Sequence, residues 1–273
     1  EDFKIYWNNF AIGKITPGKD YLNPNFELIV DDILEQNHKM KLISFLEKWL
    51  KDKINNVLKS LIDLKNLKEK NSSIKALAYQ LYENNGVIKR DQVSDYLKNL
   101  DQKERKILRD LGVKFGRYHV FLFKLIKPEA VSLRTLLWKN FHQKYFDLKP
   151  PKFGLNFLDD KNLKNRNFML LCGFEKFNNF YVRIDILERL FVKIINYDSD
   201  EKKEIKMIPE MLNLLGCNKD NFKKLLQNMS YKIREKDNEV YFKYLPLKVK
   251  NKVFSNKNKK ESPFGILKNL NFN

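Results

Sequence analysis

The segment 103–141 carries the most regular pattern of the chain, and it restricts the possible folds more than any other segment. Apolar residues such as Ile107 and Leu111 recur at helical spacing, and Gly112 follows at the position where a left-handed residue commonly ends a helix. Beyond it, polar and apolar residues alternate on both sides of Gly116, which predicts two short strands joined by a tight turn. The segment therefore predicts a helix followed by a basic β-hairpin.

The residues before this segment supply the remaining elements of a winged helix. Ser72 is a favourable cap for a helix that Gly86 would end, and residues 87–88 form a short strand candidate. A second helix is predicted next, and Asp101 with Glu104 has the capping-box spacing that begins a third. The order helix, strand, helix, helix, hairpin is typical of winged-helix units, in which the third helix and the wing contact nucleic acid.

The second half of the chain repeats this order of elements. Residues 146–166 contain Pro and Gly without periodicity, which predicts a linker. Strands are predicted beyond it at Phe168–Phe174 and Phe180–Ile184. Three helices and a terminal hairpin are predicted to follow, the helices starting at Asp185, Pro209 and Asn218 and the hairpin strands spanning Tyr231–Arg234 and Val240–Tyr244.

The first residues predict a strand pair, Phe3–Tyr6 with Phe10–Ile15, followed by a long amphipathic helix from Met40 to Leu64. We therefore predict a mainly α fold with small β-hairpins (α+β): two winged-helix-like units joined by a linker and preceded by a long amphipathic helix. The predicted divisions are 1–30 for the β-rich edge of a preceding domain, 31–145 for the long helix with the first unit, 146–166 for the linker, 167–245 for the second unit and 246–273 for a basic, disordered tail.

The charge of the chain indicates a polyanionic partner. Lys and Arg number 53 against 34 Asp and Glu, a formal net charge of +19. Such an excess favours nucleic acid over a membrane surface, and no apolar run approaches the roughly 20 residues that span a bilayer. Cys172 and Cys217 lack zinc-site spacing, which favours a reducing compartment, so we expect a cytoplasmic protein without a membrane partner. Because the chain begins at Glu1, we expect it to be part of a longer polypeptide.

The candidate nucleic-acid contacts are basic residues on and beside the two predicted hairpins and their helices. The alternative is a solvated basic surface, since winged helices also serve as protein-docking modules. The candidates are Arg105, Arg109, Lys114, Arg117, His119, Lys124, Lys127, Arg134, Lys219, Lys223, Lys224, Lys232 and Arg234.

Residues that would carry catalysis are not found in the sequence. Gly13 to Lys19 has the spacing of a phosphate-binding P-loop, but Asp20 stands where a Ser or Thr would hold magnesium. Pro17 also removes one of the backbone N–H groups that such a loop needs. His and Cys residues do not cluster, so we expect no catalytic residue, metal or cofactor in this segment.

Several segments resemble one helicase family, in the same order along the chain. They are ALAYQLYENNGVIKR, LGVKFGRYHVF, LIKPEAVSLRTLLW, YVRIDILERL, PEMLNLLGC and the terminal SPFGILKNL. Together they resemble the C-terminal region of bacterial superfamily 2 helicases related to the mitochondrial degradosome RNA helicase. The resemblance implies an ATP-dependent RNA or DNA helicase with two RecA-like motor domains before Glu1, where ATP and magnesium would bind. The present segment would then be an accessory region that contacts the motor domains of its own chain.

The sequence leaves three functions open. The first is accessory binding of single-stranded or tailed RNA or DNA, and the second is a scaffold that docks RNA-degradation partners. Phe264, Ile266 and Leu267 of the terminal SPF segment could form the apolar side of a short helix for such a protein partner. The third is a free-standing basic protein that binds nucleic acid.

Overall fold

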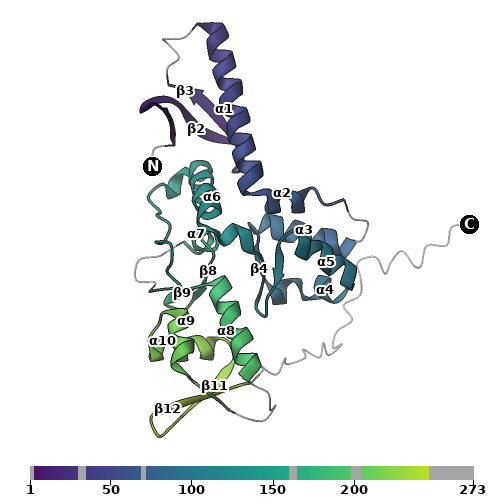
Figure 1. Ribbon diagram of the computed structural model, residues 1–273, viewed down its shortest axis with the longest axis vertical. Helices are drawn as coiled ribbons and strands as arrows, with labels where there is room; N and C mark the ends of the chain where they lie inside the picture. Colours follow the sequence, from purple (N-terminus) through teal and green to yellow (C-terminus); the bar gives the residue numbers. More distant parts are fainter. Residues whose placement is uncertain (1–2, 30–34, 69–71, 160–164, 198–203, 246–273) are drawn as a thin grey trace, which may run out of the picture.

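The computed structural model describes residues 3–29, 35–68, 72–159, 165–197 and 204–245. Within these ranges the strands form four three-stranded sheets, in which every pairing is antiparallel, and the helices lie between and beside them (Figure 1). The predicted tail 246–273, with Phe264, Ile266 and Leu267, lies outside the described residues.

The first sheet contains the strand pair predicted near the start of the chain and a third strand after it. Its order is β1–β2–β3, with β1 at Lys4–Trp7, β2 at Phe10–Asp20 and β3 at Asn23–Leu28. Asn8 and Asn9 have positive φ angles of 45° and 67°, as predicted for the tight turn. The segment with P-loop spacing lies in β2, where its backbone pairs with neighbouring strands instead of wrapping around an anion.

The predicted long amphipathic helix is replaced by two helices. Helix α1 spans Gln36–Val57 and α2 spans Lys59–Lys65, with a break at Leu58. Only Leu46, Leu50 and Ile54 are buried in α1, whereas Phe45 and Trp49 remain 58% and 47% exposed. Of the predicted apolar face of α1, only this one row of residues is therefore buried. The helix extends away from the rest of the protein beside β2 and β3 (Figure 1).

The middle of the chain follows the predicted order closely. The capping box of Asp101 and Glu104 begins α5, and Gly86 and Gly112 have the positive φ angles predicted for residues after a helix. The three strands of this part of the chain form a sheet of order β4–β6–β5. The elements are α3 (Ser72–Glu83), β4 (Val87–Lys89), η2 (Arg90–Val93), α4 (Ser94–Lys98), α5 (Gln102–Asp110), β5 (Val113–Phe115), β6 (His119–Leu122), η3 (Phe123–Ile126), α6 (Pro128–Phe141) and η4 (Gln143–Tyr145).

The last part of the chain contains two further sheets, of orders β7–β9–β8 and β10–β12–β11. The strand predicted at Phe168–Phe174 is wrong, because Asn165 caps a helix there by accepting from the Phe168 N–H. The predicted linker contributes β7. The elements are β7 (Phe157–Asp159), α7 (Arg166–Leu171), β8 (Phe174–Phe177), β9 (Phe180–Arg183), α8 (Ile184–Tyr197), β10 (Ile205–Lys206), α9 (Pro209–Leu215), α10 (Lys219–Asn228), β11 (Tyr231–Lys236) and β12 (Glu239–Tyr244).

The predicted fold class is wrong. Each predicted hairpin is part of a three-stranded antiparallel sheet, so the described residues form an α+β fold with four small sheets and not a mainly α fold whose strands form only hairpins. The turn after Phe115 also does not project as a wing, because it is enclosed against α8. The structure therefore does not support two winged-helix-like units behind a long amphipathic helix.

Arg134 joins three segments inside the protein, although we predicted it among the candidate nucleic-acid contacts. Its side chain is 0% exposed and donates to the carbonyls of Asn85, Leu125 and Leu171 at 2.7, 2.8 and 2.6 Å. Burial lowers the pKa of Arg134 to about 10, so the guanidinium stays charged at neutral pH. Arg134 is therefore a buried structural cation and is removed from the candidate phosphate contacts.

Replacing Arg134 by Met should destabilise the protein by about 3–5 kcal/mol, because the buried carbonyls would lose their charged donor. Arg109→Met is the matched control, since Arg109 is exposed and surface substitutions usually change stability by about 0.5 kcal/mol or less. Urea unfolding followed by circular dichroism measures both. Equal stability of the two variants would contradict the structural role of Arg134.

Candidate nucleic-acid interface

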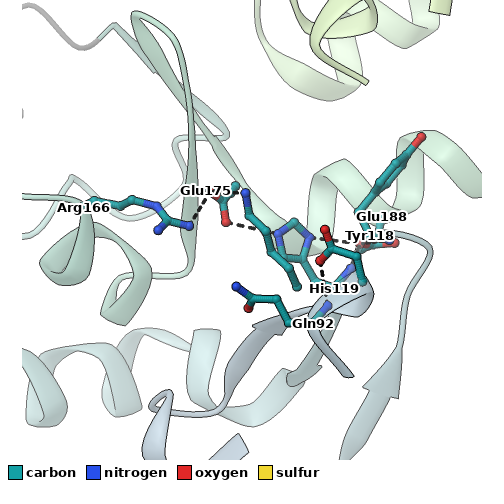
Figure 2. Close-up of polar contacts among 8 residues, drawn as sticks. Gln92, Tyr118, His119, Arg166, Glu175 and Glu188 are labelled. Carbon is teal, nitrogen blue, oxygen red and sulfur yellow. Dashed lines mark hydrogen bonds and ion pairs between the residues drawn. The ribbon is translucent and has the colours of Figure 1, made fainter. Parts of the chain in front are cut away.

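The turn between β5 and β6 is held by one carboxylate from α8. The backbone N–H groups of Tyr118 and His119 donate to the side chain of Glu188 at 3.0 and 2.8 Å. The Arg117 N–H donates to the same carboxylate. Figure 2 shows Tyr118, His119 and Glu188 at this contact. Gly116 permits this approach, because a Cβ at this position would lie 2.4 Å from the Glu188 carboxyl carbon. Residues about 70 positions apart in sequence thus form a buried contact between the middle and last parts of the chain.

His119 lies between two carboxylates behind this turn (Figure 2). Its Nδ1 is 3.2 Å from Glu188 Oε1 and its Nε2 is 3.2 Å from Glu175 Oε2. Burial opposes the charged imidazolium, but the hydrogen bonds and charges of both glutamates outweigh burial and raise the pKa of His119. Burial likewise opposes the Glu175 carboxylate, yet His119, Lys89 and Arg166 together lower the pKa of Glu175.

This position excludes His119 from the predicted phosphate contact. The side chain is 3% exposed and both ring nitrogens face carboxylate oxygens, which would repel a phosphate. The exposed cations of the hairpin, Lys114 and Arg117, stay on the surface beside it.

A groove of about 760 Å³ runs along one side of the turn, between the hairpin and α8. Its two acidic residues are already engaged, since Glu188 binds the turn and Asp185 pairs with Arg183 at 2.7 Å. Apolar surface is supplied by Phe123 and by Val192, which is 58% exposed. The cations lining the groove are Arg90, Lys114, Arg117, Arg189 and Lys193.

A second hollow, of about 660 Å³, lies on the other side of the same turn. Arg90 and Arg117 line both hollows, so they link the two surfaces. The guanidinium of Arg117 lies over the ring of Tyr244, 5.1 Å from its centroid, and Tyr244 is 37% exposed. We call the groove and this hollow, together with the turn 115–119 between them, the junction surface. It combines cations with aromatic rings, as single-strand binding surfaces do.

Of the other predicted nucleic-acid contacts in the middle part of the chain, some are exposed and one is bonded to the protein backbone. Arg105 donates to the carbonyls of Leu97 and Leu100, so it supports the end of α4. Lys124 and Lys127 are exposed, and the Lys127 ammonium lies 4.4 Å from the centroid of Phe123. These two lysines extend the positive charge from the groove along η3.

The predicted cluster on α10 and β11 is partly neutralised. Lys223 pairs with Glu235 at 2.6 Å, and Arg234 lies 3.7 Å from Glu204. Lys219 donates to the carbonyl of Asn238. Lys224 and Lys232 are exposed. This surface therefore presents fewer uncommitted charges than the junction surface.

Sequence reasoning missed Arg90, Arg189 and Lys193 as contributors to the groove. Arg189 and Lys193 are four residues apart on the exposed face of α8, which is a detectable helical pattern of cations. Arg90 gave no such signal, because its role depends on the bond that its guanidinium donates to the Gly116 carbonyl at 2.7 Å.

No protein-family model, curated protein or solved structure matches this chain. In the part of the chain that the structure describes, His, Cys, Asp and Glu side chains form no group of three or more that could hold a metal ion. None of the described helices combines the length and apolar character needed to cross a bilayer.

The charge network around His119 should make stability depend on pH. Because its pKa is raised, the stabilisation by His119 is present below its ordinary pKa of 6.5 and is lost as pH rises through the folded value. Because the pKa of Glu175 is lowered, the stabilisation by the Glu175 carboxylate is present above its ordinary pKa of 4.5 and is lost as pH falls through the folded value. The difference in unfolding free energy between wild type and His119→Gln should therefore be largest between pH 4.5 and pH 6.5, the two ordinary pKa values. His38→Gln, at an exposed position of α1, is the control. A pH-independent difference for His119→Gln would contradict the network.

The close approach of Gly116 to Glu188 predicts a specific coupling between them. Gly116→Ala should cost about 1–3 kcal/mol, since the new methyl group would displace the Glu188 carboxylate from its buried donors. In a Glu188→Ala background the same substitution should cost much less, because the carboxylate is absent. Chemical unfolding of the four proteins in this double-mutant cycle measures the coupling. Additive costs would show that Glu188 does not hold the turn.

Proposed function

We propose that this chain is the accessory nucleic-acid-binding region of an ATP-dependent helicase and that the junction surface is where it contacts a single strand. The observation that carries the binding proposal is the groove between the β5–β6 hairpin and α8. Its cations face a hollow whose two acidic residues are already engaged by other groups.

Electrostatics supports a polyanion in this groove. Lys114, Arg189 and Lys193 are exposed, and they come from two elements that converge on one concave surface. A groove lined by one sign of charge concentrates the field and attracts ligands of the opposite charge. Together with the overall charge of +19, this favours the phosphate backbone of RNA or DNA.

The aromatic and apolar groups favour a single strand over a duplex. Phe123 and Tyr244 lie beside the cations, and unpaired bases stack on such rings without sequence preference. The assignment to a helicase depends on the sequence resemblance alone. In that arrangement the motor domains of the same chain hydrolyse ATP, and the junction surface holds the strand that they move.

A protein-docking scaffold is the second candidate, because one end of the structure exposes large apolar side chains. Trp7 and Phe10, on either side of the Asn8–Asn9 turn, are 63% and 76% exposed. Exposed apolar patches of this kind are common at protein–protein contacts. This surface lies on β1 and β2, apart from the groove at the hairpin and α8 (Figure 1).

Removing three groove cations should weaken binding without unfolding the protein. We expect the combined Lys114→Ala, Arg189→Ala and Lys193→Ala variant to bind a fluorescent oligo-dT or oligo-U at least tenfold more weakly than wild type. The slope of log affinity against log salt should fall by about 2, because each phosphate contact in a single strand contributes roughly 0.7. Fluorescence anisotropy at several salt concentrations measures both quantities.

The matched control removes the same charge from α1. Lys41, Lys48 and Lys51 are exposed there, so their combined replacement by Ala lowers the net charge equally. We expect this control to bind nearly as wild type does. Equal weakening of the two triple variants would mean that only total charge matters and that the groove is not the interface.

A further inference from the structure

A separate hollow of about 730 Å³ lies between α2, α3, α6 and the end of β2. On α3, Lys75, Ala78, Tyr79 and Tyr82 follow one another at helical spacing, so they form a single stripe along one wall. The opposite wall belongs to α6. There Trp138 and Phe141, with His142 just after the last residue of the helix, have the same spacing.

The walls of this hollow are unusually aromatic, and Tyr79 is the most accessible of their rings. Its side chain is 60% exposed. Trp138 is 6% exposed and already stacks on Tyr145, with 5.1 Å between ring centroids. Tyr79 therefore offers a planar face to a ligand, while Trp138 supplies a fixed wall.

Polar groups are placed around the aromatic walls. The ammonium of Lys65 lies 5.0 Å from the centroid of the Tyr82 ring, and the exposed Lys75 adds a second cation. Tyr21 also lines the hollow, and its buried hydroxyl has no hydrogen-bond partner among the described residues. Burial raises the pKa of Tyr21, so this hydroxyl remains protonated at neutral pH and can both donate and accept.

We infer that this hollow binds a nucleobase of the single strand, stacked on Tyr79, with the attached phosphate near Lys65 and Lys75. A flat heteroaromatic ring matches the aromatic walls, and its polar edge offers partners to the Tyr21 hydroxyl. The two lysines match the negative charge that every nucleotide carries. Two carboxylates also line the hollow: Asp20 accepts hydrogen bonds from the Leu22 N–H and the Asn23 side-chain amide, and Glu83 is exposed to solvent. This inference rests on the proposed function and adds a second contact, distinct from the junction surface.

Photo-crosslinking tests this contact with the full chain. An oligonucleotide of 15 uridines carrying 5-iodouridine is bound and irradiated, and the crosslinked peptides are identified by mass spectrometry. We expect crosslinks at Tyr79 or Tyr82 in addition to any at the junction surface. Tyr79→Phe should retain affinity for the strand, whereas Tyr79→Leu should lose about tenfold, because only the first keeps an aromatic face.

The outcomes separate this inference from the proposed function. If the strand binds but crosslinks only outside α3, or if Tyr79→Leu binds as Tyr79→Phe does, the hollow is not a base site and the proposed function stands. If the strand does not bind at all, both proposals are overturned. The last test adds free uridine monophosphate as a competitor during crosslinking. Should it abolish the Tyr79 crosslink at concentrations that leave the strand bound, the hollow holds free nucleotide, and the inference of a strand contact is wrong.

Discussion

The contact on which the rest of this structure depends is the one between the Glu188 carboxylate and the three backbone N–H groups of the turn 117–119. A carboxylate forms stronger hydrogen bonds than a neutral acceptor, and its loss would leave buried donors unsatisfied at about 1–3 kcal/mol each. The contact joins the β4–β6–β5 sheet to α8 and encloses a hairpin tip that would otherwise project into solvent. His119 completes it by placing its imidazole ring between Glu188 and Glu175.

The same contact creates the candidate interface. Because the turn is held against α8, Lys114 and Arg117 of the hairpin lie near Arg189 and Lys193 of the helix and line one groove with them. The two acidic residues of the groove are occupied by the turn and by Arg183, so they do not offset these charges. A structural bond between distant segments thus produces a concentrated positive surface that neither segment would form alone.

Local features were predictable from the sequence because short-range interactions determine them. The capping box at Asp101 and the end of α5 before Gly112, whose φ is 95°, follow from residues within one helical turn. The sheets were not predictable in this way, since β7 pairs with β9 and β10 with β12 across long separations. For the same reason the fold class was wrong, and Arg134 was expected at the surface although carbonyls from three distant segments enclose it. The candidate site was predicted only in part: Lys114 and Arg117 were identified, but the partners that α8 brings to them were not.

Amide hydrogen exchange at residues 117–119 tests the central contact most directly. In the free protein, the account predicts that these three amides exchange as slowly as the amides of the surrounding sheet, and that Glu188→Gln speeds their exchange while leaving amides of the distant β1–β2–β3 sheet unchanged. Fast exchange of the three amides in the wild-type protein, at the rate of an open loop, would contradict it. The hairpin would then be free of α8, and the groove between them would not exist as a preformed surface.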